Sequence, residues 1–265
     1  MMLDRANGSV LHSSVIFQVL MVVLKPSVLL SGPTRTPRWG RAVTIDLGAL
    51  DATLAISREN RLPRASVVVT LAAQELMRLS KGGEKVENIL IIGSEVDPTL
   101  HPGFREISEN LRALRNKWFA KAKLNLLSDN PELSDPEVRI ALGFYDNPVM
   151  RLECGTVKTF QKLTGRKTTH LGEIVRHLSS LDRVIVQAQF VRGTVDNSTD
   201  TEVRGWIKRL RDVSPQEVMI SSPPPKARKG RPQGITKTRL QEIMDKVTEE
   251  IGATVTILES EDLVA

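Results

Sequence analysis

The chain has 265 residues, of which 40% are hydrophobic and 26% are charged, and its formal net charge is +6. This length and composition are typical of one large α/β domain or two small ones. The single cysteine, Cys154, excludes a disulfide within the chain and nearly excludes zinc or iron–sulfur sites made from its own thiolates. The positive charge is spread along the sequence, so it permits contact with nucleic acid or phosphate without requiring it.

The first part of the chain holds a short apolar run at 15–24, which Gln18 interrupts. A helix needs about 20 apolar residues to cross a bilayer, so we expect no membrane span here. A signal peptide is the alternative, but no clear cleavage site follows the run. We interpret residues 1–31 as an N-terminal extension and residues 32–265 as the α/β domain, and we expect the protein to be cytoplasmic.

Apolar runs and helical periodicities alternate along the rest of the chain with short links between them. We expect strands at 25–32, 43–47, 88–92, 123–127, 149–153, 183–190, 218–220 and 254–258. We expect helices at 66–79, 103–118, 135–142, 157–163, 171–181, 199–213 and 236–251. This alternation is typical of a parallel sheet with crossover helices. Right-handed crossovers would curl the sheet into a full or partial barrel.

The stretch "ILIIGSEVDPTLHP" organises the chain. Its four apolar residues at 89–92 indicate a buried parallel strand, which Gly93 ends. The prolines that follow Asp97 and His101 exclude helix at those two residues. The strand therefore leads into a loop of acidic and hydroxyl side chains at the carboxyl end of the sheet, where α/β proteins build their sites.

The candidate catalytic residues lie in this loop. Glu95, Asp97 and His101, together with Asp46 at the end of the preceding strand, could act as acid–base or metal-binding groups. The simpler alternative is that Asp97 and Thr99 cap the following helix and that His101 is a surface residue.

Two clusters of basic residues are candidate ligand or phosphate sites. Arg35, Arg38 and Arg41 flank Trp39, an arrangement that can stack on a base or bind phosphate. The alternative is that Trp39 covers one end of the barrel while its arginines lie in solvent. The second cluster lies in the proline-rich loop before the last helix and consists of Lys226, Arg228, Lys229 and Arg231. It suits phosphate, nucleotide or an acidic partner, although a solvated, mobile loop explains it almost as well. We expect this loop beside the barrel mouth, on the same side as Asp97.

The remaining chemically active side chains have simpler structural interpretations. Asp196 and Asn197 lie in a "GTVDNST" turn, where capping of the next helix is the simpler role and a site role stays open. Cys154 is interpreted as a small buried residue. His170 and His177 lie seven residues apart without a third ligand in view, which makes them poor metal candidates. The sequence has no Walker-type or dinucleotide-binding glycine fingerprint.

Several segments resemble radical SAM proteins. "IIGSEVDPTLHPGF" is similar to the "SGxGEPTLHP" segment after the second barrel strand of that family, and "GPTRTPRWGRAVTIDL" is similar to its lead-in to the first strand. Four further segments resemble later segments of the family and occur in the same order as in the family. They are "LSDNPELSDPEVRIAL", "VMRLECGTVKTFQKLTGR", "QAQFVRGTVDNST" and "VSPQEVMISSPPPKA". These matches cover nearly all of the chain after Ser31. They imply a partial (β/α)6 barrel of the TIM type, with a parallel sheet and outer helices.

The chemistry that the resemblance implies depends on three cysteines in a Cx3Cx2C loop after the first barrel strand. In the family they hold a [4Fe-4S] cluster, and its fourth iron binds S-adenosylmethionine for reductive cleavage. The best spacing match in this chain places Ala52, Ile56 and Glu59 at the three positions, and none of them supplies a thiolate. We therefore predict no metal site and no cofactor for this chain.

The glycines that admit the family's cofactor are also replaced. Ser94 and Val96 stand where glycines let the methionine end of S-adenosylmethionine approach the backbone, and Asp97 replaces the family's glutamate. The positions that match family cofactor contacts are Ser94, Val96, Asp97, Glu153, Asp196 and Asn197.

Three hypotheses for the function follow. The first is a radical SAM-like barrel that has lost its cluster and serves as a non-catalytic binding module or partner subunit, for example of an active radical SAM enzyme. The second is an enzyme of the same barrel that uses Glu95, Asp97 or His101 for other chemistry. The third is binding of nucleic acid or phosphate through the basic loop. The fold alone does not choose among them.

Overall fold

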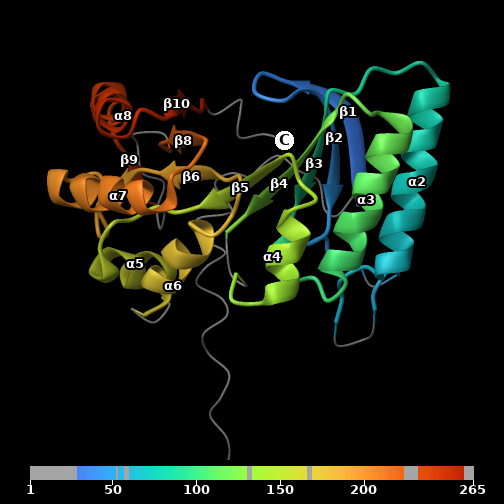
Figure 1. Ribbon diagram of the computed structural model, residues 1–265, viewed down its shortest axis with the longest axis horizontal. Coiled ribbons are helices and arrows are strands. Elements are labelled where there is room, and N and C mark those ends of the chain that lie inside the picture. Colours follow the sequence, from blue (N-terminus) through green and yellow to red (C-terminus); the bar gives the residue numbers. More distant parts are fainter. Residues whose placement is uncertain are drawn as a thin grey trace, which may run out of the picture.

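The computed structural model describes residues 29–51, 53–56, 60–129, 133–165, 169–223 and 232–259. A curved eight-stranded sheet runs through the molecule, and helices cover its outer face (Figure 1). The strands of this sheet are β1 (Leu30–Thr36), β2 (Gly40–Asp46), β3 (Asn88–Ile92), β4 (Lys123–Ser128), β5 (Asn147–Arg151), β6 (Ile185–Gln189), β8 (Glu217–Ser221) and β10 (Thr254–Ile257). The helices are α2 (Ala65–Lys81), η1 (Pro98–Leu100), α3 (Phe104–Trp118), α4 (Pro136–Leu142), α5 (Val157–Thr164), α6 (Thr169–Leu178), α7 (Asp200–Val213) and α8 (Lys237–Ile251).

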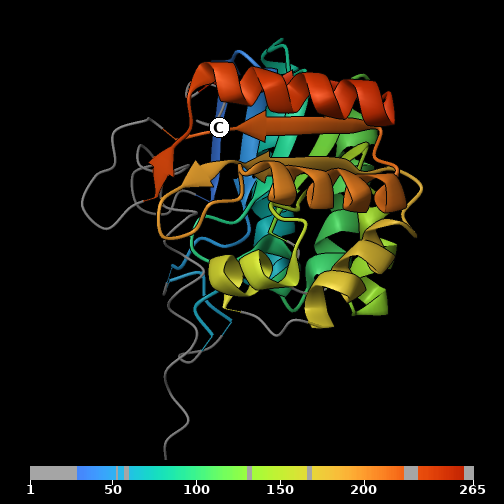
Figure 2. The same ribbon diagram turned by 90° about the vertical axis from the view of Figure 1, so that its left-hand side faces the viewer.

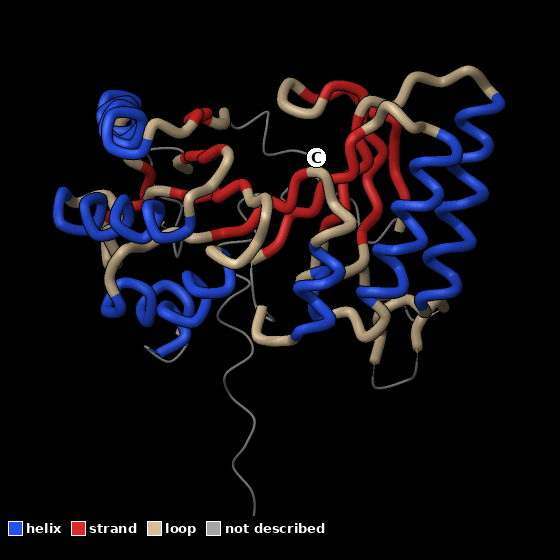
Figure 3. The backbone as a smooth tube through the Cα atoms, viewed as in Figure 1, coloured by secondary structure: helices blue, strands red, loops and turns tan. Residues whose placement is uncertain are grey.

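The strand order is β1-β2-β3-β4-β5-β6-β8-β10, so β1 and β10 are the two edges of the sheet. β1 pairs antiparallel with β2, and every other neighbouring pair in this sheet is parallel. Helices connect the parallel strands on the outside, as Figure 3 shows with strands in red and helices in blue. The predicted α/β architecture, a curled parallel sheet with outer helices, is confirmed.

Several strand bounds differ from the sequence-based expectation, and β2 begins at Gly40 instead of residue 43. The edge strand β1 does not end at Gly32-Pro33 but continues to Thr36, because the register shift between Ser31 and Thr34 accommodates that dipeptide at the edge of the sheet. Pairing to β2 thus begins at Leu30, ahead of the expected start of the domain at residue 32. β5 begins at Asn147, two residues before the predicted start, and Pro148 is part of it.

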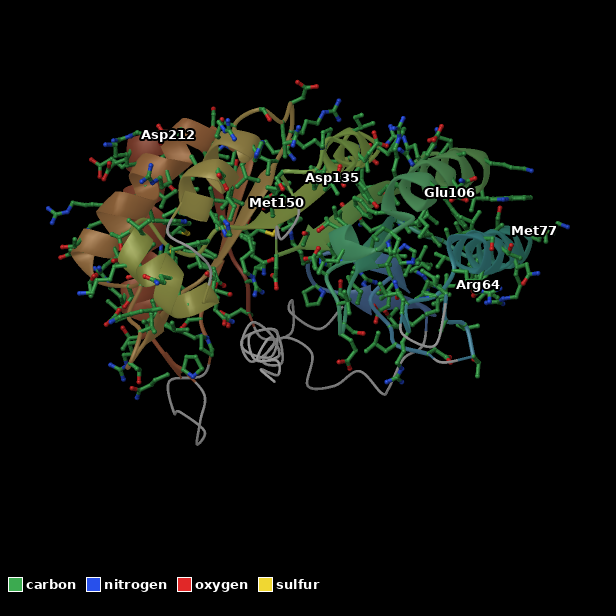
Figure 4. The ribbon with its side chains drawn as sticks, turned by 90° about the horizontal axis from the view of Figure 1, so that it is seen from below. Arg64, Met77, Glu106, Asp135, Met150 and Asp212 are labelled. Carbon is green, nitrogen blue, oxygen red and sulfur yellow. The ribbon has the colours of Figure 1, made fainter. Side chains whose placement is uncertain are left out.

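The two faces of the sheet are packed differently. Residues that point outward, such as Ile45, Ile91 and Val186, join the large core beneath the helices. The opposite face forms a smaller cluster of Trp39, Ala42, Leu90, Ile92, Val149, Ile185, Met219 and Leu258, which is the interior of the curled sheet. Met150 of β5 lies near the middle of the molecule, while Met77 of α2 and Asp212 of α7 lie toward opposite ends (Figure 4).

Polar side chains join the strands at the amino ends of the sheet. Asn88 donates to the carbonyl of Trp39 at 2.6 Å, Asn125 donates to Asn88 at 2.9 Å, and Asn147 donates to Asn125 at 2.7 Å. Each amide thus serves as a partner for the amide of the next strand, which satisfies these groups inside the curled sheet. This ladder ties β2 to β5 at the end opposite the loop after β3.

A second, two-stranded antiparallel sheet was not predicted. It pairs β7 (Val191–Arg192) with β9 (Gln233–Gly234), which follow the carboxyl ends of β6 and β8. Figure 2 shows these short strands beyond the tips of the longer ones. Within the described part of the chain, no helix has both the length and the apolar character that crossing a membrane requires.

Candidate functional site at the carboxyl ends of the strands

The loop after β3 folds back on the ends of β2 and β3. A Cβ atom added at Gly48 or at Gly93 would lie 2.0 Å from the carbonyl oxygen of Val96, so both positions require glycine. Asp46, at the end of β2, fixes the loop by accepting from the backbone N–H groups of Gly48 at 3.0 Å and Ser94 at 2.9 Å. Burial raises the pKa of Asp46 above its usual value, although these hydrogen bonds act in the opposite direction.

Asp97 is the acidic residue that binds this loop to the next strand. Its carboxylate accepts from the backbone N–H of Thr99 at 2.9 Å and from the Thr99 hydroxyl at 2.6 Å, which caps η1. It also accepts from the Ser128 hydroxyl at 3.0 Å and from the backbone N–H of Asp129 at 2.6 Å. Burial, together with the negative charge of Asp129, raises the pKa of Asp97 to about 6.

The raised pKa of Asp97 predicts a loss of stability as the pH rises. The folded state keeps the proton up to about pH 6, whereas the unfolded chain releases it near pH 4, so the free energy of unfolding falls across this interval. The Asp97 contribution is about 2–3 kcal/mol, and it should disappear in Asp97→Asn. Urea unfolding at several pH values between 4 and 7 measures it. Asp245→Asn, on the exposed face of α8, is the matched control. Parallel pH profiles of wild type and Asp97→Asn would contradict the assignment.

A cluster of charged residues lies at the ends of β4 and β5. Arg151 Nε is 3.0 Å from an Asp129 carboxylate oxygen and 3.4 Å from Glu153 Oε1, and the side chains of Arg151 and Glu153 are only 13% and 11% exposed. Burial raises the pKa of Glu153, although the positive charge of Arg151 counteracts it. The pKa of Arg151 is raised: burial alone would lower it, but the surrounding carboxylates outweigh that effect.

Sequence reasoning missed several members of this site. Asp129, Arg151, Gln189 and Ser221 were not candidates, yet they lie at strand ends on the side of the sheet that faces the interior. The signal that could have found them is the two-residue alternation of each strand, because Arg151 and Ser221 each lie two positions beyond an apolar interior residue.

Two predicted candidates are structural residues in this arrangement. His101 is buried rather than on the surface: its Nε2 donates to the carbonyl of Pro63 at 2.7 Å, and its Nδ1 accepts from the N–H of Gly103 at 3.0 Å. Burial lowers its pKa, in the direction of the neutral ring that this pairing requires. Asn197 is also buried and links β5 to β6, donating to the carbonyls of Glu153 and Gln189 at 2.8 Å each.

The expected cap of α7 is corrected, and two further candidates are located. The cap of α7 is Thr199, not Asp196 or Asn197, and Asp196 instead accepts from Ser198. The remaining loop candidate, Glu95, is exposed in the loop after β3. Cys154 is buried, as expected.

The basic residues near Trp39 lie at the amino ends of the strands, away from Asp97. Arg38 lies over the Trp39 ring at 5.0 Å and makes two hydrogen bonds, of 2.8 and 2.7 Å, to Glu217 of β8. Arg41 pairs with Glu84 at 2.5 Å. Trp39 itself is buried in the interior cluster, as the alternative interpretation expected, but Arg38 and Arg41 are ion-paired and do not simply lie in solvent. The other basic candidates, Lys226, Arg228, Lys229 and Arg231, lie outside the described residues.

The side chains of this chain do not fit a [4Fe-4S] cluster. Ile56 belongs to a turn in which its N–H donates to the carbonyl of Leu62 at 2.8 Å, while Ala52 and Glu59 lie outside the described residues. Cys154, the single cysteine of the sequence, is packed in the core beneath the helices, and burial raises the pKa of its thiol. In the described ranges, no three histidine, cysteine or acidic side chains come together as metal ligands would.

This sheet, with its outer helices and its polar carboxyl end, is a radical SAM-like fold. Streptococcus suis SuiB bound to S-adenosylmethionine matches with a TM-score of 0.53 and 14% identity, over 76% of this chain and 45% of that one. SuiB bound to its precursor peptide SuiA matches with a TM-score of 0.56 and 12% identity, over 78% and 45%. The chain thus corresponds to about 45% of the length of SuiB. In sequence comparisons, no protein family and no curated protein matches.

Proposed function

We propose that this chain is a non-catalytic binding or partner subunit built on a radical SAM-like barrel. The observation that carries the proposal is the small number and the position of the cysteines. The one cysteine of the sequence, Cys154, is buried beneath the helices and not at the mouth of the barrel. A cluster held by this chain would need several thiolates at the carboxyl ends of the strands. The chain therefore keeps the frame of the fold without the donors for its chemistry.

The loop after β3 supports the same proposal. The close approach that Gly48 and Gly93 allow is used by the backbone of Val96. The carboxylate of Asp97 already accepts hydrogen bonds from Thr99, Ser128 and Asp129. Both features stabilise a closed loop at the position where the family admits its cofactor.

The test is anaerobic reconstitution with iron and sulfide, followed by incubation with S-adenosylmethionine and a strong reductant. We expect well below one cluster per chain after desalting and no 5′-deoxyadenosine above background. An active radical SAM enzyme taken through the same procedure is the positive control, and Cys154→Ala should match the wild type in iron content. Production of 5′-deoxyadenosine that is lost in a Glu95→Ala, Asp97→Ala double variant would overturn the proposal.

For the partner, we propose an active radical SAM enzyme that carries its own cluster. A second candidate function is acid–base chemistry at the barrel mouth, which the raised pKa values of Asp97 and Glu153 favour. The hydrogen bonds that already occupy Asp97 oppose it. Phosphate binding at Arg38 or Arg41 is opposed by their ion pairs with Glu217 and Glu84.

A further inference from the structure

Three polar atoms at the carboxyl ends of the strands are buried without a hydrogen-bond partner. Among the described residues they are Gln189 Nε2, Ser221 Oγ and Glu153 Oε1, the last of which lies 3.4 Å from Arg151 Nε in an ion pair without forming a hydrogen bond. Gln189 is 4% exposed and Ser221 is fully buried. A buried polar group that makes no hydrogen bond costs about 1–3 kcal/mol, so Gln189 Nε2 and Ser221 Oγ call for a partner beyond the described side chains.

The register of the strands places these three residues in one row. Arg151 pairs with Gln187 across β5 and β6, so Glu153 and Gln189, each two residues further on, lie side by side. Gln189 pairs directly with Ser221 across β6 and β8. Parallel neighbours lie about 4.8 Å apart, and all three side chains share the face of the interior cluster. The row, which we call the Glu153–Gln189–Ser221 row, therefore offers an acceptor, a donor and a hydroxyl to one small ligand.

The charge around the row sets the charge of that ligand. Asp97, Asp129 and Glu153 supply carboxylates, and Arg151 is the cation that pairs with Asp129 and Glu153. This excess of negative charge among the described residues favours a positively charged ligand. An organic cation fits this better than a metal ion, because the described side chains include no group of three potential metal ligands.

We infer that the Glu153–Gln189–Ser221 row binds a cationic ligand with an ammonium group next to an uncharged oxygen acceptor. The ammonium group donates to Glu153, and the oxygen accepts from the Gln189 amide and the Ser221 hydroxyl. A carboxylate in place of that oxygen would be repelled by the negative charge of the site. Two sources share the required chemistry: the amino terminus of a peptide and a small amino alcohol. The inference rests on the proposed binding role and names its ligand class.

The test measures binding of small amines to the whole protein by calorimetry and thermal unfolding. Alaninamide represents a peptide amino terminus, and ethanolamine represents an amino alcohol. N-acetylglycinamide, which has no charge, and alanine, which carries a carboxylate, are the negative controls. We expect one or both amines to bind, which identifies the source, and we expect at least tenfold weaker binding of the two negative controls.

Two variants locate the site. Gln189→Met removes the donor and Glu153→Gln removes the charge, and each should weaken amine binding at least tenfold. Gln189→Met also removes a buried unpartnered group, so without ligand it should unfold at or above the wild-type temperature. Gln216→Met, at the exposed residue just before the amino end of β8, is the control away from the row and should bind like the wild type.

The inference is overturned if neither amine binds, if N-acetylglycinamide binds equally well, or if Gln189→Met binds with wild-type affinity. These failures are distinct from failure of the proposed function, which is scored by 5′-deoxyadenosine. Amine binding together with 5′-deoxyadenosine formation would keep the inference and overturn the non-catalytic role.

Discussion

Replacing Gly155 by alanine is expected to destabilise the protein by about 4 kcal/mol or more. An added Cβ would lie 2.0 Å from the backbone nitrogen of Trp206 and 2.1 Å from the carbonyl carbon of Gly205, both in α7. Backbone atoms cannot rotate away as a flexible side chain can, so α7 would have to move off the sheet.

The contacts that hold α7 explain why this movement is costly. Trp206 Nε1 donates to the carbonyl of Leu152 at 2.7 Å, and its ring packs edge-on against Phe190 with centroids 5.1 Å apart. Glu202 accepts from the hydroxyls of Thr156 at 2.6 Å and Thr159 at 2.8 Å. A shift of α7 would weaken all of these contacts together.

Urea unfolding of Gly155→Ala and Gly172→Ala measures the effect. Gly172 lies within α6, and an added Cβ there meets nothing within 4 Å. Gly172→Ala should therefore stabilise the protein by about 0.5–1 kcal/mol, as expected for glycine within a helix. A Gly155→Ala variant within 1 kcal/mol of the wild type would contradict the role of this contact.

The sequence predicted the regular elements well where the pattern was long. β3 has the predicted bounds of 88–92, and α4 begins after its Asp135 cap, because hydrophobic period and capping residues are local signals. The two-residue strands β7 and β9 are too short to leave such a pattern. The edge strand β1 was shortened because proline usually ends a strand.

The candidate site was predicted only in part, because its members meet through the fold. Asp97 was placed correctly after a buried strand, and Ser128 and Asp129, its partners from the end of β4, are 31 and 32 residues away in sequence. Arg38 was read as a ligand residue, yet its partner Glu217 lies 179 residues further on. His101 was assigned to the surface because a single sequence does not reveal that the carbonyl of Pro63 lies beside its ring.

The second large effect is expected for Arg151→Met. Removing this buried cation leaves the carboxylates of Asp129 and Glu153, which lie 3.0 and 3.4 Å from its Nε, without their positive partner. Removing one partner of a buried ion pair costs about 3–5 kcal/mol. We expect the free energy of unfolding to fall by this amount near pH 7.5. Methionine retains the length and apolar character of the arginine stem, so the loss reports the charge more than the packing.

The pH dependence of this loss distinguishes charge from packing. Burial already raises the pKa of Glu153, and without Arg151 the pKa should rise further. The folded state of Arg151→Met would then keep a proton that the unfolded chain releases near pH 4, so its stability falls as the pH rises above that value. The difference from the wild type should therefore be largest at pH 7–8 and shrink toward pH 5.

Arg112→Met is the matched control for Arg151→Met. Arg112 pairs with Asp146 at 3.0 Å but is 34% exposed, and Asp146 keeps a second partner in Arg115 at 3.1 Å. Its loss should cost about 1 kcal/mol or less. Urea unfolding of both variants and the wild type at pH 5, 6.5 and 8 makes the comparison. If the loss in Arg151→Met is no greater than in Arg112→Met, or if it grows on acidification, then the charges of Arg151, Asp129 and Glu153 do not stabilise the mouth of the barrel as a unit. If the loss of stability in Arg151→Met is large and shrinks on acidification, the carboxylates at this end of the sheet depend on a nearby positive charge. An ammonium ligand bound at Glu153 would supply further positive charge to the same carboxylates.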